Sequence, residues 1–183
     1  MDEIVRAGMN SAKLSARTRQ PGHDVTFRTS EANFVAALRV ILLEELWDIV
    51  DHPKDLLKMI GGRFGIRPEA SITYRPTGRR MYFEVKKQGK DGNADERACK
   101  HHTVQFYKTM HDLTGYDYHP YVTIMTEKLA TEVRYTLKHP VYFEQGHYFC
   151  WVDYDLESLR TFIEELAERF LANPRVHEQE VPS

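Results

Sequence analysis

The segment PEASITYRPTGRRMYFEVKK, residues 68–87, alternates apolar and polar side chains on both sides of Pro76-Thr77-Gly78. Such alternation is typical of a strand with one buried face, and a turn bounded by Pro and Gly between two such runs indicates a reversal of the chain. The segment is therefore predicted to form a β-hairpin. Helical and β-rich segments alternate after it, so we expect an α/β fold with a mixed central β-sheet flanked by helices.

Charged side chains gather on one face of this hairpin. Residues two apart on a strand point to the same side, so Glu84 and Lys86 project together, about 6 to 7 Å apart at Cα. Equal steps back from Thr77 put Glu69 opposite Val85, and a register shift of one residue still leaves the two carboxylates as cross-strand neighbours. Two convergent carboxylates suit Mg²⁺, and a nearby lysine can position or deprotonate water or stabilise charge on a phosphate. The alternative interpretation is a solvated strand face.

A second motif, GNADER, occupies residues 92–97. Gly92 permits a tight turn, and Asn93 suits a helix N-cap but can also make a bidentate contact to adenine. Arg97, one helical turn further on, can donate to a purine N7 or to phosphate. Glu96 could pair with Arg97 or accept from a base amino group. The alternative interpretation is an ordinary capped helix with acidic residues near its positive end.

Together the two motifs resemble a known family. Pro68-Glu69, followed after fourteen residues by Glu84-Val85-Lys86, is similar to the P-D…E-x-K signature of the PD-(D/E)xK superfamily of type II restriction endonucleases. GNADERACK, residues 92–100, is similar to the G-N-A-x-E-R motif of its EcoRI/MunI-like members, with MunI the nearer likeness. The resemblance covers about residues 34–171.

The resemblance implies a restriction-endonuclease-like core and a homodimer that cuts palindromic double-stranded DNA with Mg²⁺ as cofactor. It implies that Glu69, Glu84 and the Val85 carbonyl ligate Mg²⁺, and that Lys86 serves the attacking water as the third catalytic residue beside the two acids. The residues implied to contact DNA are Asp91, Gly92, Asn93, Ala94, Glu96, Arg97 and Lys100. A cognate methyltransferase is expected in the same system, without being a bound partner.

Two features depart from the family pattern. Glu69 stands where the family has Asp, and one extra methylene moves a ligand oxygen by about 1.5 Å. The segment from Lys87 to Asp91 is short, and Asp91 directly precedes Gly92. The G-N-A-x-E-R likeness implies that the inner bases are AATT, cut to leave 5′ overhangs, while Asp91 leaves the flanking base pair open. A catalytically weak, sequence-specific DNA-binding dimer and a DNA-repair nuclease are the alternative functions.

Length and composition favour one soluble domain. The chain has 183 residues, 42% hydrophobic and 28% charged, with a formal net charge of -2. That charge argues against a protein that coats nucleic acid through an overall positive charge, but it is compatible with a locally basic face. The two cysteines, the absence of a long apolar run and the polar N-terminus indicate a cytoplasmic protein without a membrane span. Residues 1–29 are predicted to form an arm that is partly disordered, and 30–183 a single endonuclease domain.

Periodicity predicts the remaining elements. Helices are expected over 31–50, 54–60, 94–114, 128–137 and 156–171, and strands over 119–125 and 146–152. Three further groups of residues have weaker signals. His101-His102, beside Cys99, are expected on a helix surface because adjacent helical residues diverge by about 100°. Glu44-Glu45 could add a carboxylate to the metal site but are expected to cover a helix surface, and the tyrosines at 116, 118 and 121 are expected to be core and edge aromatics.

Overall fold

A five-stranded mixed β-sheet forms the centre of the protein, with the strands in the order β1-β2-β3-β4-β5. The strands are β1 (Trp47–Asp51), β2 (Ala70–Tyr74), β3 (Arg79–Lys87), β4 (Tyr121–Thr126) and β5 (Tyr148–Trp151). The first three strands are antiparallel, whereas β4 and β5 continue the sheet in parallel with β3. The predicted mixed sheet is therefore confirmed.

The computed structural model describes residues 30–56, 66–88 and 92–172. The predicted arm over 1–29, most of the predicted helix over 54–60, and Asp91 lie outside these ranges. The described helices are α2 (Ser30–Ile41), α4 (Ala94–Ala98), α5 (Val104–Thr114), α6 (Lys128–Thr131), α7 (Val133–Thr136), α8 (His139–Tyr142) and α9 (Leu156–Leu166). Short turns of 3-10 helix, η2 (Cys99–His101) and η3 (Val152–Tyr154), and a π-helical turn, η4 (Ala167–Leu171), complete the set. None of the helices in the described ranges has the length and apolarity to cross a membrane.

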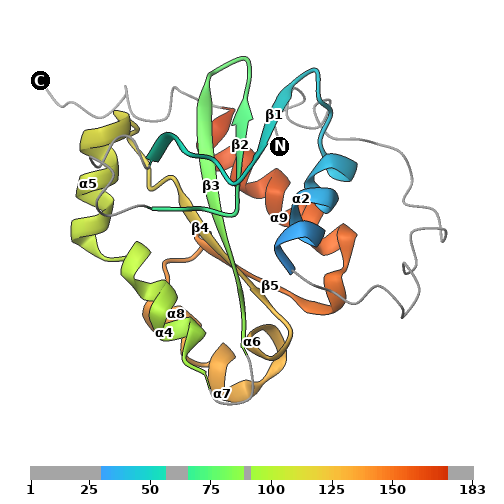
Figure 1. Ribbon diagram of the computed structural model, residues 1–183, viewed down its shortest axis with the longest axis vertical. Helices are drawn as coiled ribbons and strands as arrows, with labels where there is room; N and C mark the ends of the chain where they lie inside the picture. Colours follow the sequence, from blue (N-terminus) through green and yellow to red (C-terminus); the bar gives the residue numbers. More distant parts are fainter. Residues whose placement is uncertain (1–29, 57–65, 89–91, 173–183) are drawn as a thin grey trace, which may run out of the picture.

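The sheet separates two layers of helices that differ in chemistry. Figure 1 shows α2 and α9 on one side of the sheet and α4, α5 and α8 on the other. Alternate residues of β3, including Phe83 and Val85, join the large apolar core under α2 and α9. Phe34 of α2 lies at its centre, with its ring 5.1 Å from Phe83 and 5.9 Å from Trp151. The intervening β3 residues, among them Glu84, face the α4–α5 layer.

The predicted hairpin is present, with a register one residue away from the predicted one. Ala70 pairs with Phe83 and Tyr74 with Arg79, so Glu69 aligns with Glu84 and not with Val85. The difference arises because the turn contains an even number of residues, from Arg75 to Gly78. Its centre therefore lies between Pro76 and Thr77 and not at Thr77. Gly78 has φ +69 and donates its N–H to the Tyr74 carbonyl at 2.8 Å, which closes the turn.

Two predicted helices are shorter than expected. The helix predicted over 31–50 ends at Ile41, and Trp47–Asp51 pairs with β2 as the edge strand β1. Trp47 is buried with its ring 4.8 Å from Tyr74, a contact that sheet pairing creates. The helix predicted over 94–114 breaks before Thr103, whose side chain accepts from Phe106 N and caps α5. Gly115 ends α5 in the left-handed conformation, with φ 71.

Other elements follow the sequence more closely. The strands β4 and β5 and the amphipathic α9 lie where periodicity predicts them, and 128–137 forms the two short helices α6 and α7. The short helix α8 was not predicted. Tyr118 and Tyr121 are buried, which confirms the expected core position of these aromatics.

His119 and His147 lie buried in the α4–α5 layer, and His102 is half-buried beside them. His102 and His119 have ring centroids 5.3 Å apart, and His119 and His147 are 5.0 Å apart. Burial lowers the pKa of His102 to about 2, of His119 to about 4 and of His147 to about 3. Each folded ring therefore stays neutral through the mildly acidic range in which an exposed histidine takes up a proton.

This difference predicts acid sensitivity. The unfolded chain binds protons below about pH 6.5 while the folded rings do not. The stability that these rings contribute is therefore full above that pH and is lost as the pH falls toward their folded pKa values of about 4 for His119, about 3 for His147 and about 2 for His102. Each histidine should contribute a loss of about 1.4 kcal/mol per pH unit. Urea unfolding followed by circular dichroism at pH 7.5, 6.0 and 5.0 measures the slope.

A pair of variants assigns this slope to the buried rings. The His147 ring stacks on the Phe170 ring, with the centroids 5.0 Å apart, so a phenylalanine should fit at position 147. His147→Phe should reduce the slope of unfolding free energy against pH by the contribution of one histidine, about 1.4 kcal/mol per pH unit. His52→Phe, at an exposed position, is the control for introducing a phenylalanine. Equal stability at pH 7.5 and 5.0 in the unsubstituted protein would contradict the prediction.

Candidate active site

Glu69 and Glu84 meet at one edge of the α4–α5 layer. Glu69 precedes β2 and continues its ladder by donating its N–H to the Phe83 carbonyl at 2.9 Å. Its side chain reaches back across the strand, where Oε2 accepts from Val85 N at 3.0 Å. Both carboxylates are largely buried, with side chains 13% exposed in Glu69 and 7% exposed in Glu84. The cross-strand juxtaposition predicted from the sequence is therefore present, although its functional role stays a prediction.

Lys86 lies between the two carboxylates. Its Nζ is 3.8 Å from Glu69 Oε1 and forms a close ion pair with Glu84 Oε1. The lysine side chain is 25% exposed, so the ammonium sits where the buried pair opens toward solvent. The Lys86 carbonyl accepts from Thr126 Oγ1 at 3.1 Å, which fixes the backbone of this strand against β4. The two Oε1 atoms thus converge on one positive charge.

The two carboxyl groups differ in acidity. Burial raises the pKa of Glu69 to about 7, and the nearby charge of Glu84 adds to this effect while Lys86 opposes it. Burial alone would also raise the pKa of Glu84, but the hydrogen bond and charge of His101, together with Lys86, outweigh it and lower that pKa. The site therefore holds one stable negative charge and a second group that stays partly protonated near neutral pH.

This donor set fits a hard divalent cation. Oε1 of Glu69 and Oε1 of Glu84 already converge on the Lys86 ammonium, so the same two oxygens can face a hard cation. Within the described residues no cluster of three or more His, Cys, Asp or Glu side chains forms a metal site. Side chains would therefore supply two ligands, and Mg²⁺ commonly keeps several waters in such sites. The Val85 carbonyl, the third predicted ligand, belongs to the same strand, between Glu84 and Lys86.

His101 contacts this site, although the sequence placed it on a helix surface. Its side chain is buried, and Nδ1 lies 2.5 Å from Glu84 Oε2. The neighbouring His102 also turns inward, with Nε2 2.9 Å from Thr123 Oγ1. Both rings point inward because the helix ends in the 3-10 turn η2 and does not continue to Thr114. The signal that could have revealed this is Thr103, which is a good N-cap for a new helix.

The GNADER motif begins α4, but its capping differs from the prediction. Asn93 occupies the N-cap position without a side-chain capping bond, and Gln88 Oε1 accepts from Ala94 N at 2.9 Å in its place. A Cβ on Gly92 would lie 2.2 Å from Gln88 Nε2, so a larger residue here would displace the Gln88 side chain that caps the helix. The exposed Asn93 side chain is therefore left available for other contacts.

Most of the predicted DNA-contacting residues lie on the surface of α4 and η2. Gly92, Asn93, Glu96, Arg97 and Lys100 are exposed, and Ala94 is half-buried. Asp91 is outside the described residues.

Lys138 organises the acidic residues of this segment. Asp95 points inward with 1% exposure, and Lys138 Nζ is 3.8 Å from its Oδ2 and 3.5 Å from Glu96 Oε1. Glu96 therefore pairs with Lys138 and not with Arg97, which has no acidic partner among the described residues. Lys138 could not be predicted as a partner of Glu96 from the sequence, because the two residues lie more than forty positions apart in the chain.

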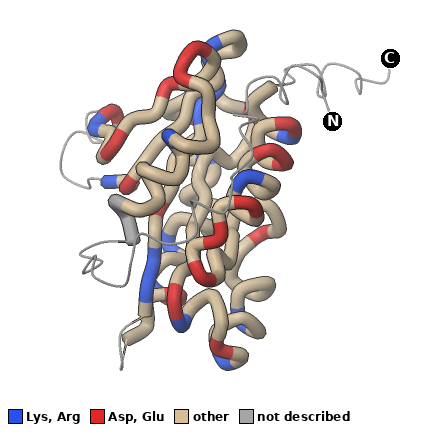
Figure 2. Tube along the Cα trace, turned by 90° about the vertical axis from the view of Figure 1, so that its right-hand side faces the viewer, with Lys and Arg blue, Asp and Glu red and all other residues tan. Residues whose placement is uncertain are grey.

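Positive charge is local in this protein. Figure 2 shows Lys and Arg interspersed with Asp and Glu along the described trace. A polyanion would therefore meet particular positive side chains, such as Lys86, Lys87, Arg97 and Lys100.

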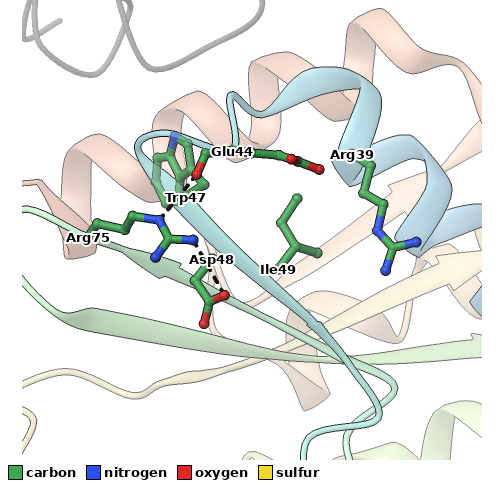
Figure 3. Close-up of a pocket in the computed structure, with 6 residues that line it drawn as sticks. All are labelled: Arg39, Glu44, Trp47, Asp48, Ile49 and Arg75. Carbon is green, nitrogen blue, oxygen red and sulfur yellow. Dashed lines mark hydrogen bonds and ion pairs between the residues drawn. The ribbon is translucent and has the colours of Figure 1, made fainter.

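Glu44 lies far from the carboxylate pair. Figure 3 shows it beside Arg75, Asp48 and Trp47 in an open hollow of about 310 Å³. Arg75 Nε donates to the Glu44 carbonyl at 3.2 Å, and Arg75 follows β2 whereas Glu69 precedes it. Six residues of extended chain span about 20 Å, so the suggestion that Glu44 supports the metal site is wrong.

Comparisons with known proteins agree with this architecture. No protein-family model and no curated protein matches the sequence. Among solved structures, the fold is similar to the crystal structure of MunI restriction endonuclease in complex with cognate DNA, with a TM-score of 0.60 and 20% sequence identity. The match covers 74% of this chain and 89% of that chain. The chain therefore has a restriction-endonuclease-like fold, which confirms the predicted fold class.

Proposed function

We propose that this protein is a Mg²⁺-dependent type II restriction endonuclease that hydrolyses phosphodiester bonds of double-stranded DNA at a short palindrome. One observation carries the proposal: Glu69, Glu84 and Lys86 lie together at one point of a restriction-endonuclease-like sheet, with the spacing of a P-D…E-x-K signature. The similar structure is that of a restriction endonuclease in complex with cognate DNA.

The side chains divide the chemistry between them. Glu69, Glu84 and the Val85 carbonyl would hold Mg²⁺, which when bound supplies a Lewis acid and lowers the pKa of a bound water. Lys86, at the open side of the carboxylate pair, is the group that can touch a phosphate oxygen or orient the attacking water. Glu69 must lose the proton that burial favours before it can act as a ligand, so cation binding and deprotonation are linked.

The start of α4 would read DNA. Asn93 and Arg97 are one helical turn apart and exposed, and Gln88 caps the helix so that the Asn93 amide is not used for capping. Gly92, Ala94 and Glu96 would complete the contacts to inner bases, and Lys100 would touch phosphate. The expected centre is AATT with 5′ overhangs, and Asp91 leaves the flanking pair open.

A DNA-binding dimer with weak catalysis is the second candidate. It is favoured by Glu69 itself, because one of its oxygens is already engaged by Val85 N. Plasmid digestion with Mg²⁺ separates the candidates. Discrete fragments support restriction, nicks at lesions indicate a repair nuclease, and band shifts without cutting indicate the binding dimer.

The first prediction concerns catalysis. Lys86→Ala and Glu84→Ala should each lower the cleavage rate by about 10²- to 10⁴-fold, because each removes a member of one catalytic unit. Lys86→Ala should keep its affinity for the specific duplex in a gel-shift assay. Lys108→Ala, an exposed lysine of α5, serves as the control and should cut normally.

Variants of Glu69 complete this test. Glu69→Asp should retain or improve cutting if residue 69 is a ligand, since the family has Asp there. The active site would lie elsewhere if Lys86→Ala cut DNA at the rate of the unsubstituted protein. The same would follow if Glu69→Ala cut DNA without any loss of rate.

The second prediction concerns assembly. One chain carries one E-x-K sequence, whereas a cut through both strands of a palindrome needs two sites related by a two-fold axis. A homodimer is therefore expected, and light scattering with and without DNA measures it. A species that stays monomeric under both conditions would contradict this part of the proposal.

The third prediction concerns base recognition. Sequencing the ends of digested random DNA should show an A·T-rich centre, AATT in the full form of the prediction. Asn93→Ala should weaken binding of that site by about 1 to 3 kcal/mol, the value of a good bidentate base contact, with little effect on other DNA. Gln105→Ala, an exposed amide on α5, is the matched control. Fragment ends without any central preference would refute the assignment of Asn93.

A further inference from the structure

Glu84 is held by residues from two different elements. Its Oε1 pairs with Lys86 of the same strand, while its Oε2 accepts from His101 Nδ1 at 2.5 Å. His101 belongs to η2, which directly continues α4. The segment that presents Asn93 and Arg97 to solvent at one end therefore presents His101 to the buried carboxylate at the other.

The imidazole ring of His101 has little freedom to turn. It lies 4.6 Å from the Tyr121 ring and 5.1 Å from the Phe106 ring, centroid to centroid. The His101 carbonyl also accepts from His119 Nε2 at 2.9 Å. Because the His101 ring cannot turn freely, its Nδ1 holds Oε2 of Glu84 in one position. A shift of the His101 backbone would therefore move the donor relative to that oxygen.

The connection between the two ends of the segment is short and regular. Arg97 N donates to the Asn93 carbonyl at 3.0 Å, and His102 N donates to the Cys99 carbonyl at 2.9 Å. Ala98, between these bonds, is fully buried against a cluster that includes Met125 and Leu129. The exposed end of α4 is therefore joined to His101 by continuous helical backbone that is packed against the protein at Ala98.

We propose that His101 is a positioning residue that couples the DNA-reading segment to the cation-binding carboxylate Glu84. The coupling to DNA rests on the proposed function, whereas the effect of His101 on cation affinity does not. Partners that orient a metal-binding carboxylate commonly change metal affinity by about 10- to 100-fold when they are removed. If DNA sets the position of α4, the cation and the specific sequence must strengthen each other's binding by the same factor.

A titration without DNA tests the link between His101 and Glu84. Mn²⁺ binding, followed by the electron paramagnetic resonance of the free ion, is measured for the unsubstituted protein, His101→Leu, His101→Asn and His102→Gln. His101→Leu should bind Mn²⁺ about 10- to 100-fold more weakly. His101→Asn should stay within a few fold of the unsubstituted protein, because its amide nitrogen can take the place of Nδ1 as donor.

His102→Gln is the matched control. His102 is the adjacent inward-facing histidine, and it contacts Thr123 in place of a carboxylate. Its substitution should change stability without changing Mn²⁺ affinity. If His101→Leu does not fold, His101→Met replaces it as a flexible side chain without a donor. Equal affinities for the donor-lacking variant and the unsubstituted protein, or for His101→Asn and the donor-lacking variant, would overturn the assignment.

A second measurement tests the coupling to DNA. Duplex affinity is measured with and without Ca²⁺, for an AATT-centred palindrome and for a scrambled duplex, with each duplex checked for intactness. Ca²⁺ should favour the palindrome over the scrambled duplex in the unsubstituted protein and in His101→Asn, typically by about 5- to 150-fold. In His101→Leu the factor by which Ca²⁺ favours the palindrome over the scrambled duplex should fall toward one.

The outcomes separate the inference from the proposed function. An unchanged Ca²⁺-linked preference in His101→Leu would overturn the coupling. If the unsubstituted protein prefers no duplex, the proposed function fails and the coupling with it. The titration without DNA would still decide whether His101 positions Glu84.

Discussion

The antiparallel pairing of β2 with β3 is the constraint on which the rest of the structure depends. It sends alternate residues of β3 to opposite faces, so Phe83 and Val85 enter the apolar core while Glu84 and Lys86 face α4 and η2. It also brings Glu69 beside Glu84. A buried carboxylate without partners is costly, and this cost explains why Lys86 and His101 both contact Glu84.

The two faces of the sheet divide stability from chemistry. The layer under α2 and α9 holds the large apolar cluster, including Phe34, Trp47 and Trp151. The layer under α4 and α5 buries histidines and carboxylates, which depend on specific partners and on their protonation states. One face can tolerate polar groups because the other buries enough apolar surface to hold the same strands in place.

The sequence was informative where local chemistry decides the structure, as in the hairpin, α9 and the strands β4 and β5. It failed where distant contacts decide. Trp47 continues the helical spacing of α2, yet pairing with β2 makes its segment a strand. The inward turn of His101 depends on where the helix breaks, and the role of Lys138 depends on contacts across the fold. The close pairing of Glu69 with Glu84 was predictable because an error of one residue in register does not separate them.

The extra methylene of Glu69 has a use in this geometry. Glu69 precedes β2, and its longer side chain reaches Val85 N with Oε2 while Oε1 stays directed at Lys86. Glu84 divides its oxygens in the same way, with Oε2 on His101 and Oε1 on Lys86. Each carboxylate therefore gives one oxygen to a protein donor and offers the other to a single cation. In the proposed metal site these two donors would fix both carboxylates, so the backbone of β3 and the segment that ends at His101 would set the position of the cation.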